Sequence, residues 1–205
     1  MRIISGSRRG AKLAQVEGTD IRPTSDRIRE AVFDVLAAHQ APIGGGNVAD
    51  LFAGTGAMGL EAISRGAAGA WFLDSSPVSL KIIQKNTEIC RFADRSVLIR
   101  WDLSRGIATP HLLAQPFDLV FLDPPYGLGW VRRILDDIAF RLPLRPGAVI
   151  VAEHEDKLSR EIMAAYDDSQ SCDRPGEENP RAVLWQQKKY GRTAVSYFSL
   201  VSSDQ

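Results

Sequence analysis

The residues most suited to chemistry stand together at Asp123-Pro124-Pro125-Tyr126, directly after an apolar run. The two prolines restrict the backbone and remove two N–H donors, so the carbonyl oxygens of Asp123 and Pro124 remain as fixed hydrogen-bond acceptors. With the Asp123 carboxylate they can hold a planar NH₂ group, and Tyr126 can stack on the ring that bears this amine. The alternative is that the motif is a rigid proline turn without a chemical role. The motif predicts chemistry at an exocyclic amine, in which Asp123 either accepts the proton or only orients the nitrogen.

A glycine-rich segment at residues 50–59 provides a second candidate site. Gly54, Gly56 and Gly59 fit the pattern G-x-G-x-x-G between an expected strand and an expected helix. Glycines at such positions form a tight turn and let a ligand approach the backbone. Several nucleotide cofactors bind loops of this kind, and a tight turn without a ligand is the alternative. The segment therefore predicts a cofactor site without identifying the cofactor.

Three acidic residues at expected strand ends narrow the choice of cofactor. Asp74 follows Gly54 by about 20 residues, where a carboxylate can bind the ribose of NAD or of S-adenosylmethionine (SAM). Asp50, at the mouth of the loop, would repel a pyrophosphate but suits the ammonium and sulfonium groups of SAM; alternatively it caps a turn. Asp102 can accept a hydrogen bond from the adenine amino group, or it is a solvated acid. Together these acids favour SAM.

Short β-rich runs alternate with helical stretches from residue 47 onward, which predicts a parallel sheet covered on both faces. The last two runs have no room for a helix between them and predict an antiparallel hairpin. We therefore expect an α/β fold with seven mostly parallel strands, and a polar surface loop at 167–181. The expected strands are 48–53, 69–74, 96–102, 117–123, 148–153, 182–189 and 194–201, and the expected helices are 57–65, 77–91, 104–113, 129–141 and 157–166.

Residues 1–43 are predicted to form a short extension ahead of a main domain at 44–205. The extension begins with two short strands around a glycine turn, and a helix follows over residues 24–39, capped by Thr24 or Ser25. Its first part is basic, so we expect either a frayed terminus or an arm that contacts a phosphate backbone. The basic residues of this arm are Arg2, Arg8, Arg9 and Lys12.

The composition of the chain limits which surface charge, cellular location and metal sites can be expected. The 205 residues carry 25 Lys and Arg against 25 Asp and Glu, a formal net charge of zero, which excludes a uniformly basic surface. No apolar run is long enough for a transmembrane helix, and the N-terminus does not resemble a secretory signal. Cys90 and Cys172 provide neither a disulfide framework nor zinc-ligand spacing. We therefore expect a cytoplasmic protein without membrane contacts and without a metal, and a monomer.

Several blocks of the sequence resemble the bacterial 16S rRNA guanine-N2 methyltransferase family usually written RsmD, which is a class I SAM-dependent methyltransferase family with a Rossmann-like fold. The most specific block runs from Arg22 to Phe33 (RPTSDRIREAVF), and a second runs from Asp50 to Ala62 (DLFAGTGAMGLEA). The resemblance covers essentially the whole chain. The D-P-P-Y motif alone is shared with DNA adenine methyltransferases, so it does not identify the family by itself.

The resemblance implies methyl transfer from SAM to the N2 amino group of a guanine in 16S rRNA, within a small-subunit ribosomal particle, with S-adenosylhomocysteine as the product. Asp123, Pro124 and Tyr126 would bind the flipped-out guanine, and the basic arm would bind RNA. Position 74 is Asp where Glu is expected more often, and either binds the ribose. The cofactor-binding residues implied are Thr24, Arg27, Asp50, Phe52, Ala53, Gly54, Gly56, Asp74, Ser75, Asp102, Leu103 and Asp123.

Two other functions remain open at this point. DNA adenine-N6 methylation would use the same D-P-P-Y chemistry, but 205 residues leave no separate target-recognition domain. A non-catalytic SAM-binding assembly factor is the other alternative, and the intact motif argues against it.

Aromatic and histidine residues outside these motifs have mainly structural interpretations. Trp101 can flank the adenine or pack in the core, and Trp130 can cover the target base or pack on a helix face. His39, His111 and His154 have neither metal-ligand spacing nor a nucleophile partner, so we expect all three to be non-catalytic.

Overall fold

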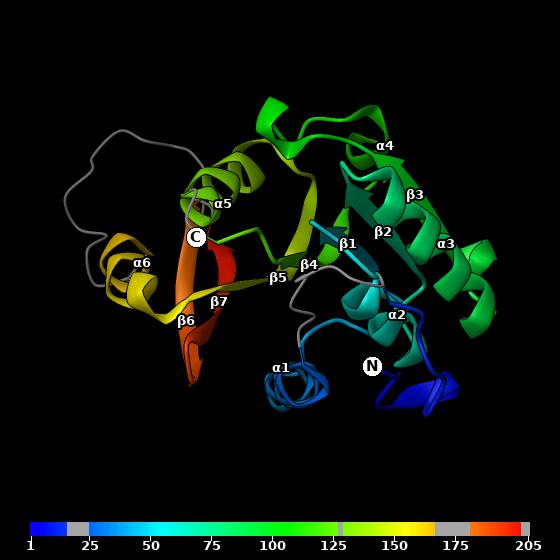
Figure 1. Cartoon of the computed structure of the whole chain (residues 1–205). Coiled ribbons are helices and arrows are strands. Elements are labelled where there is room, and N and C mark those ends of the chain that lie inside the picture. The colour runs from blue at the N-terminus through cyan, green and yellow to red at the C-terminus, as the bar shows by residue number, and fades with distance from the viewer. Residues whose placement is uncertain (16–24, 127–128, 167–180, 202–205) are drawn as a thin grey trace.

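A computed structural model of the chain describes residues 1–15, 25–126, 129–166 and 181–201, and Figure 1 shows the arrangement of its elements. Seven strands form one sheet in the order β3-β2-β1-β4-β5-β7-β6. Neighbours among β1 to β5 are parallel, while β7 is antiparallel to β5 and to β6. The predicted α/β class and the closing hairpin are confirmed. The strands are β1 (Asn47–Leu51), β2 (Gly69–Asp74), β3 (Ser96–Arg100), β4 (Phe117–Leu122), β5 (Leu144–Glu155), β6 (Arg181–Tyr190) and β7 (Thr193–Val201).

Helices cover both faces of the sheet, as parallel strands joined by crossovers require. One face carries α1 (Asp26–Ala38), α2 (Ala57–Ser64) and α3 (Pro77–Cys90), and the other carries α4 (Pro110–Leu113), α5 (Trp130–Arg141) and α6 (Ser159–Tyr166). Successive strand residues serve opposite faces, since Val48 belongs to the first buried cluster and Ala49 to the second. In Figure 1, α1 and α2 lie below the sheet and α4 and α5 above it. Short 3-10 turns are η1 (Gly6–Arg8), η2 (Ala93–Arg95), η3 (Leu103–Arg105) and η4 (Asp156–Leu158).

Capping residues set the starts of two of these helices. The Ser76 side chain accepts a hydrogen bond of 3.3 Å from the backbone N–H three residues on, and Pro77 begins α3. Ser25 caps α1 in the same way by accepting from the Ile28 N–H at 3.2 Å. The predicted cap at Ser25 is confirmed, and the alternative cap, Thr24, lies outside the described residues.

The predicted helix over residues 104–113 is wrong. The structure has the short turn η3 and the one-turn helix α4 in its place. Gly106 between them has a φ of +93°, and Thr109 is extended with φ −106° and ψ 147°. A residue that precedes a proline is disfavoured in the helical region, so Pro110 starts a new helix instead of continuing an old one.

Two strands have boundaries that differ from the predicted ones. β3 ends at Arg100 instead of residue 102, because Asp102 has left the sheet and caps η3. β5 begins at Leu144 instead of residue 148, and its first part contains Pro146 and Gly147. Proline and glycine weaken the sequence signal of a strand, so the first residues of β5 were not predicted.

The N-terminal segment, residues 1–15, is packed against the domain and is not frayed. It contains one antiparallel bridge, between Arg2 and Lys12, where two strands were predicted. Its Ile3 and Leu13 are buried in the same apolar cluster as α1, α2 and α3. The segment is therefore anchored by its apolar side chains, while Arg2, Arg9 and Lys12 remain exposed.

Three further expectations concern the chain as a whole. The boundary between residues 1–43 and 44–205 stays a prediction. Residues from both parts contribute to one buried apolar cluster. The loop predicted at 167–181 lies outside the described residues except for Arg181, which begins β6. Within the described ranges, no helix has the length and apolar character to cross a membrane, and no cluster of His, Cys, Asp or Glu could hold a metal ion.

Candidate active site

The carboxyl ends of four neighbouring strands bring the predicted acidic residues to one edge of the sheet. Asp50 lies one residue before the end of β1, Asp74 ends β2, Asp102 follows β3 and Asp123 follows β4. Because the strand order there is β3-β2-β1-β4, these acids lie at the same edge of the sheet, where open α/β sheets bind their ligands. The structure thus brings together residues that the sequence predicted for one site.

The loop after β1 has the backbone shape that a ligand cradle needs. Gly54 and Gly56 have φ angles of +56° and +75°, in the region that favours glycine. A Cβ added to Gly54 would meet a carbonyl oxygen at 3.9 Å and nothing closer, so the loop is open there. A Cβ on Gly59 would lie 2.5 Å from the Phe72 ring, so this glycine serves helix–sheet packing. Phe52 has a φ of +58°, a strained conformation that clusters at binding sites.

Asp74 joins this loop to the end of β2. Its Oδ2 accepts a hydrogen bond from the Gly54 N–H at 2.9 Å, and its Oδ1 accepts from the Ser76 N–H at 2.8 Å. A carboxylate has about four lone-pair sites, so the partly exposed Asp74 keeps acceptor capacity for ribose hydroxyls. With the open Gly54 and the exposed Ser75 beside it, these residues fit the nucleoside of SAM.

Asp50 lies beneath the loop and is only 3% exposed. Its Oδ2 accepts a hydrogen bond from the Gly59 N–H at 2.9 Å, so it does cap the turn, as the sequence allowed. Burial raises the pKa of Asp50 to about 7, opposed by the Gly59 hydrogen bond and assisted by the charge of Asp74. An ammonium group placed beside Asp50 would stabilise its ionised form. Contact between Asp50 and the cofactor stays a prediction.

We expect Asp50 to make the folded protein less stable as the pH rises. Its native pKa of about 7 lies above its ordinary value of 3.8, so between these values the folded state keeps a proton that the unfolded state releases. The free energy of unfolding should fall by up to about 4 kcal/mol over this range and level off above it. Asp50→Asn keeps an acceptor for Gly59 but cannot ionise. Urea denaturation at about pH 5 and about pH 8 should therefore show a larger fall in the wild type than in the variant, and equal falls would contradict the prediction.

Asp102 and Leu103 occupy the turn that follows β3. Asp102 is exposed, and its Oδ1 accepts a hydrogen bond from the Ser104 N–H at 2.9 Å. Hydrogen bonds from Ser104 lower the pKa of Asp102, with smaller help from the charges of Arg105 and Arg133. Leu103 is buried beside it. An ionised acceptor next to an apolar residue suits an adenine ring and its amino group.

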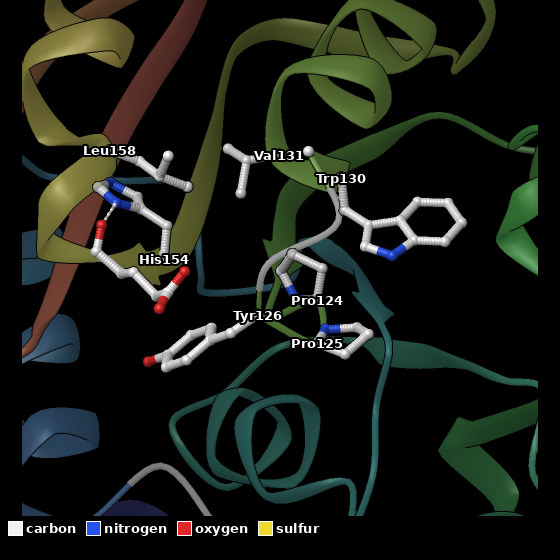
Figure 2. A pocket seen from close by; sticks show the side chains of 9 residues that line it. Pro124, Pro125, Tyr126, Trp130, Val131, His154 and Leu158 are labelled. Carbon is white, nitrogen blue, oxygen red and sulfur yellow. Dashed lines mark hydrogen bonds between the residues drawn. The ribbon is translucent and has the colours of Figure 1, made fainter.

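Pro124, Pro125 and Tyr126 of the motif line a shallow pocket between the end of β4, the start of α5 and the end of β5. Pro124 is buried, Asp123 is half-buried and Tyr126 is 40% exposed. In Figure 2 the Tyr126 ring lies below the pocket, and His154 with Leu158 lies above it on the left. Tyr126 and the two prolines of the motif thus border this opening, and Asp123 precedes them directly after β4.

Two residues from distant parts of the chain hold the Tyr126 ring. Its hydroxyl lies 3.0 Å from Oγ1 of Thr193 in β7 and 3.5 Å from Oε1 of Glu153 in β5. Thr193 is buried, so it offers a fixed partner. These contacts orient the ring as a stacking surface requires. The sequence pattern did not indicate Thr193, because an ordinary strand residue gives no signal of a contact across 67 positions.

The structure shows where Trp130 and His154 pack. Trp130 was expected to cover the target base or to pack on a helix face, and His154 was expected to be non-catalytic. The Trp130 indole points away from the pocket in Figure 2 and packs edge-on against Phe52, with ring centroids 5.6 Å apart. Trp130 is one of the residues that line the pocket, and its indole packs toward the cofactor loop. His154 is buried, which lowers its pKa, and its ring nitrogens lie 2.9 Å from the Glu155 carbonyl oxygen and 2.8 Å from Ser196 Oγ. These contacts give His154 a structural role.

Some of the site residues predicted in the N-terminal part of the chain lie within the described residues. Thr24 lies outside the described residues, and Arg27 is exposed on α1. Asn86 of α3 joins the N-terminal segment to the glycine loop, a contact that no sequence pattern indicated. In the basic arm, the exposed residues are Arg2, Arg9 and Lys12, whereas Arg8 is half-buried.

The sheet order, the glycine loop after its first strand and the acids at the strand ends define a class I SAM-dependent methyltransferase. More particularly, the chain belongs to the family described as Conserved hypothetical protein 95, the RsmD family, which matches residues 1–199. The resemblance inferred from the sequence blocks is thereby confirmed.

Named relatives and a solved structure agree with this family. Ribosomal RNA small subunit methyltransferase D of Escherichia coli K12 is 34% identical over 158 residues, which cover 76% of this chain and 75% of that protein. The proposed rRNA methyltransferase YlbH of Bacillus subtilis is 34% identical over 155 residues, covering 76% of this chain and 83% of its own. The structure of the proposed E. coli methyltransferase yhhF has a TM-score of 0.71 and 29% identity, and the match covers 97% of this chain and 96% of that one.

Proposed function

We propose that this protein transfers a methyl group from SAM to the N2 amino group of a guanine in 16S rRNA. The observation that carries the proposal is the position of the Asp123–Tyr126 motif beside the glycine loop. β4 pairs with β1 in parallel register, and the Asp123 N–H lies 3.5 Å from the Leu51 carbonyl oxygen. The acceptors for an amine therefore lie next to the loop that would hold the cofactor. When bound, SAM supplies a methyl group on a positively charged sulfur.

The protein's own part in the reaction is positioning and hydrogen bonding. The carbonyl oxygens of Asp123 and Pro124 and the Asp123 carboxylate accept hydrogen bonds from the guanine amine, which localises its lone pair on the nitrogen. Tyr126, held by Thr193, stacks on the base and fixes its plane. Holding the nitrogen in line with the methyl group supplies much of the rate enhancement by proximity.

The cofactor site in this proposal follows the row of strand ends. Asp50 and the glycine loop hold the methionine end, Asp74 with Ser75 holds the ribose, and Asp102 with Leu103 holds the adenine. The further residues assigned to this site are Thr24, Arg27, Phe52, Ala53, Gly54, Gly56 and Asp123.

The substrate is proposed from the named relatives and from the exposed basic arm. Relatives named ribosomal RNA small subunit methyltransferase D point to RNA of the small subunit, and Arg2, Arg9 and Lys12 are exposed for phosphate contacts. A formal net charge of zero suits a shaped ribosomal particle better than free RNA. We propose that a cytoplasmic monomer acts on such a particle.

Methyl transfer from labelled SAM tests this function directly. Small ribosomal subunits that lack the modification, naked 16S rRNA and duplex DNA are offered in parallel, and the labelled nucleoside is identified after digestion. We expect N2-methylguanosine at one position of 16S rRNA, with the subunits labelled fastest. Label on DNA adenine would replace this proposal with the DNA methyltransferase alternative. Tight SAM binding without label on any substrate would favour the non-catalytic factor.

A further inference from the structure

One peptide group of the glycine loop is held at both of its ends. The Gly56 N–H donates to the Ala53 carbonyl oxygen at 2.7 Å, and the Thr55 carbonyl oxygen accepts from Nδ2 of Asn86 at 2.9 Å. A trans peptide is planar, so its C=O and N–H point in opposite directions and these two bonds fix its orientation. This peptide lies inside the G-x-G turn that faces the cofactor site.

Asn86 is itself held by the N-terminal segment. Its Oδ1 accepts from the Ala14 N–H at 2.7 Å, and its Nδ2 also donates to the Ala14 carbonyl oxygen at 3.1 Å. The side chain is fully buried, so these bonds form without competition from water. A second contact joins the same parts, since Sδ of Met1 lies 3.8 Å from Oγ1 of Thr55.

We infer that Asn86 is a positioning residue of the cofactor site and that the N-terminal segment completes this site. Asn86 does not have to touch the cofactor for this role. It sets the orientation of the Thr55–Gly56 peptide before the cofactor arrives, and the Ala14 backbone sets the rotamer of Asn86. The arm assigned to RNA thus also keeps the cofactor loop in its binding shape. The inference rests on the proposed use of SAM.

The loop is supported on its other side by a residue that the cofactor is expected to engage. Asp74 accepts from the Gly54 N–H at 2.9 Å, and in the proposed function the same carboxylate also binds the ribose. Asn86 is buried in the protein interior, so its hydrogen bonds do not depend on whether Asp74 binds a ribose. A preorganised loop costs less to order on binding, so losing Asn86 should weaken cofactor affinity.

Calorimetric titration with S-adenosylhomocysteine tests this role without requiring methyl transfer. Asn86→Ala should bind it about tenfold more weakly than the wild type, because the Thr55 carbonyl loses its buried donor. Hydrogen exchange of the Gly54–Gly56 amides should also be faster in this variant.

Ser64→Ala provides the matched control. Ser64 Oγ donates to the Ser5 carbonyl oxygen at 2.6 Å and accepts from the Arg8 N–H at 3.0 Å. It therefore holds the same segment through another buried side chain, and its two hydrogen bonds go to Ser5 and Arg8 instead of the loop peptide. We expect its affinity for S-adenosylhomocysteine to stay within about twofold of the wild type.

Three other results would overturn the inference. Equal weakening in both variants would show that loosening the segment, and not the loss of the Asn86 bond to Thr55, weakens binding, so Asn86 would have no positioning role. Wild-type affinity in Asn86→Ala would show that the loop does not need this support. A wild type that does not bind S-adenosylhomocysteine at all would overturn the proposed cofactor as well, which separates that failure from the first two.

Discussion

Asp123→Ala should methylate its RNA substrate about 100- to 1,000-fold more slowly than the wild type, measured in single turnovers at saturating SAM. The variant keeps the Asp123 and Pro124 carbonyl oxygens but loses the negatively charged acceptor beside them. Because this acceptor is held at the end of β4, its contribution requires little reorganisation during the reaction. Affinity for S-adenosylhomocysteine should change far less than the rate.

Asp123→Asn distinguishes the two roles that the motif allows for this carboxylate. An asparagine keeps one acceptor oxygen in place but cannot take up a proton. We expect an intermediate rate, because the methylated nitrogen is cationic until it loses a proton, and this loss restores the delocalisation of its lone pair into the ring, so water can accept the proton. An asparagine variant as slow as the alanine variant would instead assign proton transfer to Asp123. Asp94→Ala, at an exposed position in η2, should match the wild type.

The row of acids at the strand ends could be predicted from the sequence because topology alone determines it. The carboxyl ends of parallel strands joined by helices lie at the same edge of the sheet, so Asp74, Asp102 and Asp123 had to lie along this edge once their strands were recognised. The boundaries mattered little for this conclusion. β3 ends two positions before Asp102 instead of at it, yet Asp102 remains at this edge of the sheet.

The supports of the site could not be predicted, because their chemistry is ordinary and their partners are distant. Asn86 lies in a helix with an amphipathic pattern, and Thr193 lies in a strand, where threonine is common. Each becomes informative only when packing brings it to Thr55 or to the Tyr126 hydroxyl. Neither contact leaves a local signal, because the hydrogen-bonding partners are 31 and 67 positions apart.

A buried charge network joins the N-terminal segment to α1 and α2. Glu61 has no exposed surface and accepts hydrogen bonds from the N–H groups of Ile4 and Ser5 at 2.7 and 2.9 Å. It also accepts from Nε of Arg65 at 2.8 Å and lies 3.7 Å from Nε of the fully buried Arg29. One carboxylate thus forms ion pairs with two guanidinium groups and accepts hydrogen bonds from two backbone donors.

Glu61→Ala should lower the free energy of unfolding by about 3–5 kcal/mol, a large part of the stability of an ordinary domain. The change leaves the buried Arg29 with Asp26, 2.8 Å away, as its ion-pair partner among the described residues. Glu61→Gln keeps the shape and an acceptor oxygen, so it should lose less. Urea denaturation measures both, and Glu161→Ala, exposed on α6, should shift the value by less than about 0.5 kcal/mol. A loss below about 1 kcal/mol in Glu61→Ala would show that the network is not needed for stability.

The same variants separate the anchoring of the N-terminal segment from global stability. Ile4 and Ser5 donate their N–H groups to Glu61, so their amide exchange should accelerate in Glu61→Ala even under conditions where the domain remains folded. The segment also carries Ala14, whose backbone holds Asn86. Release of the segment should therefore weaken S-adenosylhomocysteine binding, although Glu61 lies on α2 and is not assigned to the cofactor site. Faster exchange at Ile4 and Ser5 with unchanged affinity would mean that the contacts at Ala14 hold the cofactor loop independently of this anchor.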